Sequence, residues 1–309
     1  MGKVAFVFPG QGSQDVGMGK DIAASDDDAR ATFEEADAVL ESALSKLCFE
    51  GPVDELKLTE NTQPAVVTTS IALLRALRET PDVAAGHSLG EYSAHVAAGT
   101  LSFADAVRTV RVRGGFMQDA VPVGEGAMAA ILKASRETVD AVCDAIDGVV
   151  EPVNYNSPEQ IVIAGSADAV AKAGEALKAK GARAMPLPVS APFHSSLMKP
   201  AEERLAPVLQ KIEMKAPAFP VYCNVHATPI TDADAARQAL IDQVSRPVRW
   251  QESIEAMVAA GVTLFVEIGP GKVLTGLIRR IDKSAKRVNL QGPADLQAAR
   301  AAIAEAREG

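Results

Sequence analysis

Short runs of small aliphatic residues alternate with longer amphipathic stretches along most of this 309-residue chain. The runs at 4–8, 82–85, 219–225, 263–268 and 286–290 have the length and composition of buried strands. Helical patterns follow most of them. Strands that alternate with helices form a mostly parallel sheet that is covered on both faces. The sequence therefore predicts an α/β fold.

The middle of the chain interrupts this alternation. Between residues 124 and 191 the predicted order is strand, helix, strand, strand, helix, strand, which is the order of a ferredoxin-like (βαββαβ) unit. We therefore predict a small ferredoxin-like domain over 124–191. It would be inserted into a larger, α/β-hydrolase-like catalytic domain made of residues 1–123 and 192–309.

Charge and cysteine content limit the classes of function. The chain has 31 Lys and Arg against 40 Asp and Glu, a formal net charge of −9. Such a chain is poorly suited to general binding of nucleic acid or anionic membranes, and we expect neither partner. Three widely spaced cysteines (Cys48, Cys143, Cys223) lack metal-ligand spacing and predict free thiols in a reducing compartment. No signal-peptide core or membrane-spanning run is found, so we expect a cytoplasmic protein.

Three consecutive aspartates, residues 26–28, precede a stretch with helical spacing at 29–47. Acidic side chains are favourable at helix N-termini because the helix dipole is positive there. We therefore interpret this cluster as the N-terminal end of a helix rather than as a metal site.

The strongest local signal is the sequence Gly-His-Ser-Leu-Gly at residues 86–90, between a predicted strand and a predicted helix. This is the pattern of a nucleophile elbow, in which a sharp turn projects the serine from the edge of the sheet. Glycines make room for the turn, and the following helix directs amide dipoles at a developing oxyanion. We predict that Ser88 is a nucleophile; a plain tight turn is the alternative.

A nucleophilic serine needs a base, and the chain has four histidines. His87 adjoins the serine and should point away from it, His95 lies about two helical turns further on, and His226 has no accompanying motif. We expect structural roles for these three. His194 lies where the chain returns from the small domain to the large one, and clefts form at domain junctions. His194 is therefore the candidate base.

Two further residues could act only inside a cleft. Arg113 lies on a largely apolar helical stretch and could hold a carboxylate through two parallel hydrogen bonds, although the pattern alone favours a surface arginine. Gln11 lies between two glycines, so its main-chain N–H can approach a ligand closely. The segment lacks the lysine and hydroxyl residue of a phosphate loop, which argues against nucleotide binding there.

Taken together, these motifs resemble those of the malonyl-CoA:acyl carrier protein transacylases of bacterial type II fatty acid synthesis. The resemblance extends from about residue 4 to residue 290, in the family's order. The matching segments are Pro9–Ser13, Gly86–Glu91, Arg113–Gln118, Asn154–Pro158, Ala191–His194, Gln243 with Pro247–Val248, and Gly269–Gly271. The resemblance implies transfer of a malonyl group from malonyl-CoA to the phosphopantetheine thiol of acyl carrier protein. It implies no cofactor and no metal.

The resemblance also implies roles for individual residues. Ser88 would accept the acyl group, and His194 would be its base. The main-chain carbonyl of Gln243 would hold the other ring nitrogen of His194 and so fix its tautomer. Arg113 would bind the free carboxylate of the malonyl group.

In the same family, two main-chain N–H groups stabilise the oxyanion. Here they would belong to Gln11 and Leu89. Further residues expected in the cleft are Met117, Asn154 and Phe193.

The expected partner, acyl carrier protein, is strongly acidic in this family, although this chain is acidic as well. Basic residues cluster between positions 272 and 287, where Asp282 is the only acid. A local positive field can overcome the repulsion of the net charges, so we hypothesise a carrier docking patch; a solvated helix face is the alternative. The patch consists of Lys272, Arg279, Arg280, Lys283, Lys286 and Arg287. We expect the chain to be a monomer.

Three other interpretations stay open. An α/β-hydrolase-type esterase would share the serine elbow, but its histidine should lie near the C-terminus, whereas more than a hundred residues follow His194. A docking module without activity would not need Ser88, His194 and Arg113 together. An acyltransferase of a polyketide pathway would apply the same chemistry to another carrier, and the sequence barely separates it from the first interpretation.

Overall fold

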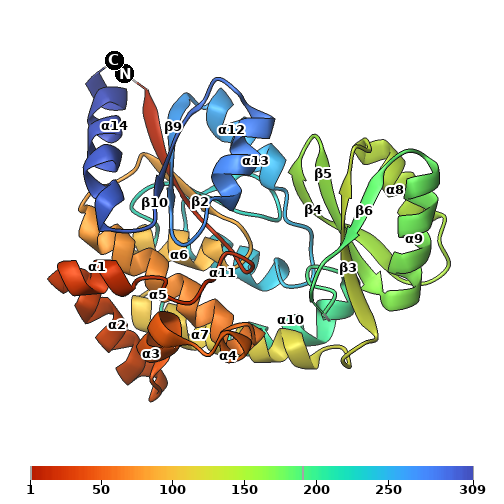
Figure 1. The fold of residues 1–309 in the computed structure, drawn as a ribbon, viewed down its shortest axis with the longest axis horizontal. Coiled ribbons are helices and arrows are strands. Elements are labelled where there is room, and N and C mark those ends of the chain that lie inside the picture. The colour runs from red at the N-terminus through yellow and green to blue at the C-terminus, as the bar shows by residue number, and fades with distance from the viewer. Residues whose placement is uncertain (1, 190, 309) are drawn as a thin grey trace.

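The computed structural model describes residues 2–189 and 191–308, and its strands form two sheets (Figure 1). In this described part the larger sheet has six strands in the order β10-β9-β1-β2-β7-β8. Neighbours are parallel except β7 and β8, which are antiparallel. The strands are β1 (Lys3–Phe8), β2 (Val83–Gly86), β7 (Val221–Tyr222), β8 (Pro229–Ile230), β9 (Val262–Ile268) and β10 (Lys286–Leu290). The prediction of an α/β fold is confirmed.

Both faces of the larger sheet are covered by helices. Side chains alternate along β1, so that Val4 and Phe6 belong to one hydrophobic cluster while Ala5 and Val7 belong to another. The first cluster is closed by α2 (Asp27–Leu40), α5 (Thr59–Leu77) and α14 (Leu296–Glu308), and the second by α12 (Trp250–Ala259) and α13 (Val273–Ile281). This double cover explains why the strands are continuously apolar.

The smaller sheet is antiparallel throughout, with the order β4-β5-β3-β6. Its elements are β3 (Gly126–Leu132), α8 (Arg136–Asp144), β4 (Val150–Ser157), β5 (Gln160–Ser166), α9 (Ala167–Ala179) and β6 (Arg183–Pro186). Helices α8 and α9 cover its outer face (Figure 1). From the other face Met128, Ala130 and Val153 join the cluster that contains Phe6 and Phe8, so the two sheets share one core.

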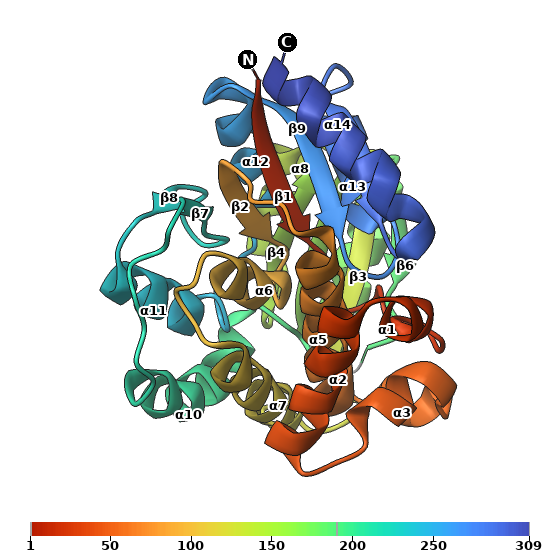
Figure 2. The same ribbon diagram turned by 90° about the vertical axis from the view of Figure 1, so that its left-hand side faces the viewer.

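The remaining helices are α1 (Lys20–Ser25), α3 (Leu44–Glu50), α4 (Val53–Leu56), α6 (Gly90–Ala97), α7 (Phe103–Asp119), α10 (Lys199–Gln210) and α11 (Ala233–Asp242). Two short 3-10 turns, Ser196–Met198 and Pro293–Asp295, precede α10 and α14. Figure 2 shows α5, α6 and α7 beside one another below β1 and β2. Within the described residues, no helix has the length and apolarity that crossing a membrane requires.

Two helix boundaries differ from the sequence-based expectation. The stretch 29–47 is two helices rather than one, because Glu41 takes a left-handed conformation (φ 49°) that ends α2. The spacing of apolar residues predicts a helix over 64–79, whereas helix α5 begins at Thr59, five residues before Pro64. A proline near the beginning of a helix removes at most one intrahelical hydrogen bond, so the helix tolerates it.

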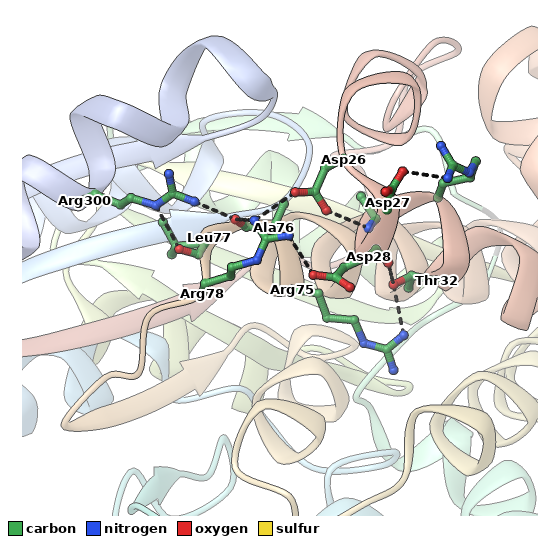
Figure 3. A network of polar contacts seen from close by, with 11 residues as sticks. Asp26, Asp27, Asp28, Thr32, Arg75, Ala76, Leu77, Arg78 and Arg300 are labelled. Atoms are coloured by element: carbon green, nitrogen blue, oxygen red, sulfur yellow. Dashed lines mark hydrogen bonds and ion pairs between the residues drawn. The ribbon is translucent and has the colours of Figure 1, made fainter.

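The aspartate cluster lies at a helix N-terminus, as predicted (Figure 3). Asp26 caps α2, and Arg78 at the end of α5 forms ion pairs with Asp26 (2.9 Å) and Asp28 (2.7 Å). Arg300 of α14 donates a hydrogen bond to the carbonyl of Leu77 (3.1 Å). The network thus joins α2, α5 and α14 at the C-terminal end of α5. Its role is structural.

Candidate active site

A pocket of about 530 Å³ opens at the carboxyl ends of β1 and β2, between the larger and the smaller sheet. Such edges of parallel sheets are where ligands bind in α/β proteins. The residues predicted from sequence that line it are Gln11, Ser88, Leu89, Arg113, Met117, Asn154, Phe193 and His194. Gln243 is fully buried beneath them. The structure therefore brings the whole predicted site together.

Ser88 occupies a sharp turn between β2 and α6. Its φ is 51°, in the left-handed region that non-glycine residues rarely adopt. A Cβ atom on Gly86 would lie 1.8 Å from the carbonyl carbon of Gly90, and one on Gly90 would lie 2.0 Å from the carbonyl oxygen of Phe8. No side chain fits at either position. The Gly-x-Ser-x-Gly spacing is thus required by close backbone approach.

Ser88 and His194 form a hydrogen-bonded pair, with 2.7 Å between Oγ and Nε2. On the other side of the ring, Nδ1 donates to the main-chain oxygen of Gln243 over 2.6 Å. A carbonyl oxygen only accepts, so the proton lies on Nδ1 and the lone pair of Nε2 faces the serine. Burial, followed by the charge of Arg113, lowers the pKa of His194 to about 3. The imidazole is therefore neutral and available as a base.

Arg113 projects from α7 to the floor of the pocket and is only 1% exposed, so the interpretation of a surface arginine is wrong. Its guanidinium donates to Gln63 Oε1 (2.8 Å), to Gln243 Oε1 (2.8 Å) and to Ser88 Oγ (3.2 Å). These acceptors are amides and a hydroxyl. The positive charge interacts with the buried carboxylate of Glu91, and at the floor of the pocket it can also attract an anionic group that reaches the serine.

Gln11 and Leu89 follow two adjacent parallel strands. Gln11 lies three residues beyond the end of β1, and Leu89 precedes the first turn of α6. The first N–H groups of a helix have no intrahelical acceptor, so Leu89 is well placed to donate to a ligand. Both residues line the pocket around Ser88, where an oxyanion would form.

The other three histidines are placed as expected for structural roles. His87 Nε2 contacts Asn156 Oδ1 over 2.8 Å and so links the elbow to β4 of the smaller sheet. His95 is fully buried on α6, and burial lowers its pKa to about 4. His226 is exposed. Only His194 among the four bonds to the serine.

Two buried residues that bond to the elbow backbone and to Arg113 were not predicted from the sequence. Asn224, just after β7, accepts a hydrogen bond from the main-chain N–H of Ser88 (2.6 Å) and donates to the carbonyl of Gly86 (2.7 Å). Its position near the end of the predicted strand 219–225 was the available signal. Gln63 on α5, which positions Arg113, carried no recognisable signal because it precedes the predicted helix 64–79 and belongs to no motif.

The predicted docking patch is extended rather than compact. Lys272 is exposed at the start of α13, and a Cβ atom on the preceding Gly271 would lie 3.5 Å from Ser13, beside the pocket. Arg279 and Arg280 are exposed in the last turn of the same helix. They lie about 10 Å further from the pocket edge along the helix axis.

Comparison with known proteins identifies the family to which this chain is similar. Residues 5–300 match the family model of the acyl transferase domain. The chain is 51% identical over 306 residues to a malonyl CoA-acyl carrier protein transacylase of Bacillus subtilis (strain 168), covering 97% of this chain and 96% of that protein.

Solved structures with the same fold are found as well. An acyl carrier protein S-malonyltransferase from Vibrio cholerae superposes with a TM-score of 0.94 at 49% identity, covering 96% of this chain and 99% of that one. A malonyl-transacylase in complex with a type II PKS acyl-carrier protein gives a TM-score of 0.94 at 47% identity, with 96% and 98% covered.

Proposed function

This chain belongs to the malonyl-CoA:acyl carrier protein transacylase family of acyl transferases, and on that basis we propose that it transfers malonyl groups from malonyl-CoA to acyl carrier protein. The observation that carries the proposal is the buried Arg113 directly beside the Ser88–His194 pair. A nucleophile next to a fixed cation selects an acyl group that carries its own carboxylate.

In the first half-reaction Ser88 Oγ attacks the thioester carbonyl while His194 Nε2 takes the hydroxyl proton. The oxygen of the tetrahedral intermediate is negatively charged and is stabilised by the N–H groups of Gln11 and Leu89. The C–S bond then breaks, and the coenzyme A thiolate receives the proton from His194. Malonyl-Ser88 remains, with its free carboxylate on Arg113.

In the second half-reaction the phosphopantetheine thiol of the carrier enters the same pocket. His194 takes the thiol proton, and the sulfur attacks the ester carbonyl of malonyl-Ser88. The C–O bond breaks, and Ser88 recovers its proton from His194. The sequence of steps is ping-pong and balances with these side chains alone. The absence of a cofactor and the cytoplasmic location stay predictions.

The finer fold description is also part of this proposal. We infer a ferredoxin-like domain over 124–191 inserted into an α/β-hydrolase-like domain of residues 1–123 and 192–309. The order β3-α8-β4-β5-α9-β6 and the antiparallel pairing of the smaller sheet support the first part. The serine elbow after a strand of the parallel sheet supports the second.

An esterase is not favoured by the geometry. In α/β-hydrolases an acidic side chain orients the histidine, whereas here His194 is held by the main-chain carbonyl of Gln243. The polyketide alternative has one observation in its favour, the similar transacylase solved with a type II PKS carrier. Transfer rates from malonyl-CoA to a fatty acid carrier and to a polyketide carrier, measured side by side, distinguish the two pathways.

We expect Arg113→Met to remove the preference for malonyl groups. The loss of charge-assisted hydrogen bonds should slow malonylation of Ser88 by about 30- to 300-fold relative to wild type. Acetylation from acetyl-CoA does not use this cation and should change far less. Intact-protein mass spectrometry after mixing with malonyl-CoA, acetyl-CoA or methylmalonyl-CoA measures both rates. An equal fall for malonyl and acetyl groups contradicts the role given to Arg113, and absence of any wild-type malonyl adduct contradicts the proposed function.

We expect the double variant Arg279→Glu and Arg280→Glu to raise the KM for acyl carrier protein severalfold, because two exposed positive charges become negative. Malonyl-CoA hydrolysis should stay unchanged. Two other patch members are less available to a partner: Lys286 is paired with Glu305 (2.6 Å), and Arg287 is half-buried and donates to the main-chain carbonyl of Asp282 (3.0 Å). An unchanged carrier KM would show that the carrier docks elsewhere.

A further inference from the structure

Glu91, which follows the elbow motif in the first turn of α6, has no part in the steps above, yet it is fully buried directly behind the reacting pair. Its Oε2 accepts two hydrogen bonds, from the main-chain N–H of Asn224 (3.0 Å) and from Nε2 of Gln243 (2.9 Å). A buried carboxylate is costly unless its oxygens are paired. These two donors are residues that hold the nucleophile and the base.

Through Gln243, Glu91 is connected to the base, His194. The side chain of Gln243 has a single possible orientation, because its Oε1 accepts from Arg113 and its Nε2 donates to Glu91. The same residue presents its main-chain oxygen to His194 Nδ1. Fixing this side chain also fixes the carbonyl that sets the tautomer and the direction of the imidazole.

Through Asn224, Glu91 is also connected to the nucleophile, Ser88. Glu91 fixes the main chain at Asn224, and the amide of Asn224 bonds to the N–H of Ser88 and to the carbonyl of Gly86. These bonds hold the left-handed turn at Ser88, which has φ 51°. Glu91 is thus the common partner of two branches that end on Ser88 and on His194.

We propose that Glu91 is a positioning residue that keeps Ser88 and His194 in reactive geometry by accepting hydrogen bonds from Asn224 and Gln243. The inference rests on the proposed function, because it assigns a task within that reaction. Displacement of reacting groups by about 1 Å from a productive geometry can cost on the order of 100-fold in rate. A single acceptor that fixes both groups has a correspondingly large effect.

Glu91 has a second conceivable task, as the buried counter-charge of Arg113. Groups that face it from the surrounding elements are Arg113 on α7, His95 and Tyr92 on α6, and Cys223 after β7. Burial raises the pKa of Glu91 and outweighs the bonds from Asn224 and Gln243 and the charge of Arg113, which lower it, so that the net pKa is about 7. The two tasks are separable, because an amide keeps an acceptor oxygen but loses the charge.

The substitution Glu91→Gln can keep both hydrogen bonds. Both donors point at Oε2, so the amide oxygen can take that place and the NH₂ group can turn toward His95 Nε2, which lies 3.9 Å from Oε1. Glu91→Met removes both acceptors at similar volume. A matched control is Glu267→Met: Glu267 is likewise buried (1% exposed) and accepts hydrogen bonds, but at the start of α13 rather than at the dyad.

The experiment measures the acylation rate constant of Ser88 by rapid quench and intact-protein mass spectrometry, and Tm by thermal unfolding, on all three variants. Malonyl-CoA and acetyl-CoA serve as acyl donors. We expect Glu91→Met to lose about 100-fold with both donors, and Glu91→Gln and Glu267→Met to stay within about threefold although their Tm falls. If Glu91→Met does not fold, Gln243→Met with acetyl-CoA tests the same branch and should lose about tenfold.

The outcomes are distinct. Glu91→Met at the wild-type rate would overturn the inference, since Glu91 would then contribute to stability alone. Equal losses in Glu91→Gln and Glu91→Met would also overturn it, in favour of the counter-charge. A wild-type chain that forms no malonyl adduct would count against the proposed function itself, before any variant is compared.

Discussion

Ser88→Ala is expected to abolish the malonyl adduct and to slow transfer to acyl carrier protein by about 10⁶-fold, because the covalent route disappears with the hydroxyl. His194 and the oxyanion donors remain in such a variant but have no acyl acceptor to activate. The change removes one oxygen at a half-buried position, so the fold should persist. Intact-protein mass spectrometry after mixing with malonyl-CoA, followed by the transfer assay, measures both effects.

The control for Ser88→Ala is Ser93→Ala, which alters a buried serine on α6, the helix that follows Ser88, outside the pocket. It should keep the wild-type adduct. A malonyl-sized adduct on Ser88→Ala would place the nucleophile elsewhere, and peptide mapping would locate it.

His194→Ala should slow acylation of Ser88 by about 10³- to 10⁴-fold, which is the contribution of a well-placed general base in such a reaction. The size of the effect follows from the geometry. The imidazole is 2.7 Å from Ser88 Oγ, is held by the carbonyl of Gln243, and is neutral because its pKa is lowered by burial and by Arg113. Within the described residues no other histidine bonds to the serine.

Single-turnover acylation by malonyl-CoA measures this loss. His226→Ala, which alters an exposed histidine, is the matched control and should react at the wild-type rate. A loss of less than tenfold in His194→Ala would assign the base to another group or to solvent.

Features that depend on neighbouring residues could be predicted from the sequence. The strand–turn–helix at Ser88 is a local property, because Gly86 and Gly90 are needed where the backbone approaches itself. The alternation of apolar strands and helices is also local and gave the parallel sheet, and the strand and helix order of 124–191 was predicted correctly. The N-terminal role of Asp26 follows from the dipole of its own helix.

Roles that depend on distant partners were decided by the tertiary structure. Arg113 has the pattern of a surface arginine until Gln63 and Gln243, 50 and 130 residues away in sequence, surround it. Asn224 lies 136 residues from the serine whose backbone it holds. The periodicity of a helix or strand indicates which of its faces is buried, but not which polar groups of other elements that face contacts.

Gln243 shows most clearly what cannot be predicted from the residue types of a sequence. It orients His194 with a main-chain carbonyl, and every residue has one, so no residue type in the sequence marks that task. The resemblance to a family was needed to name it. By itself the sequence determined the elbow and the order of elements, because these are set by local sterics and periodicity, and it predicted Ser88 as the nucleophile. The tertiary structure alone decided which buried polar groups meet behind the nucleophile, because that depends on how the chain folds back over more than a hundred residues.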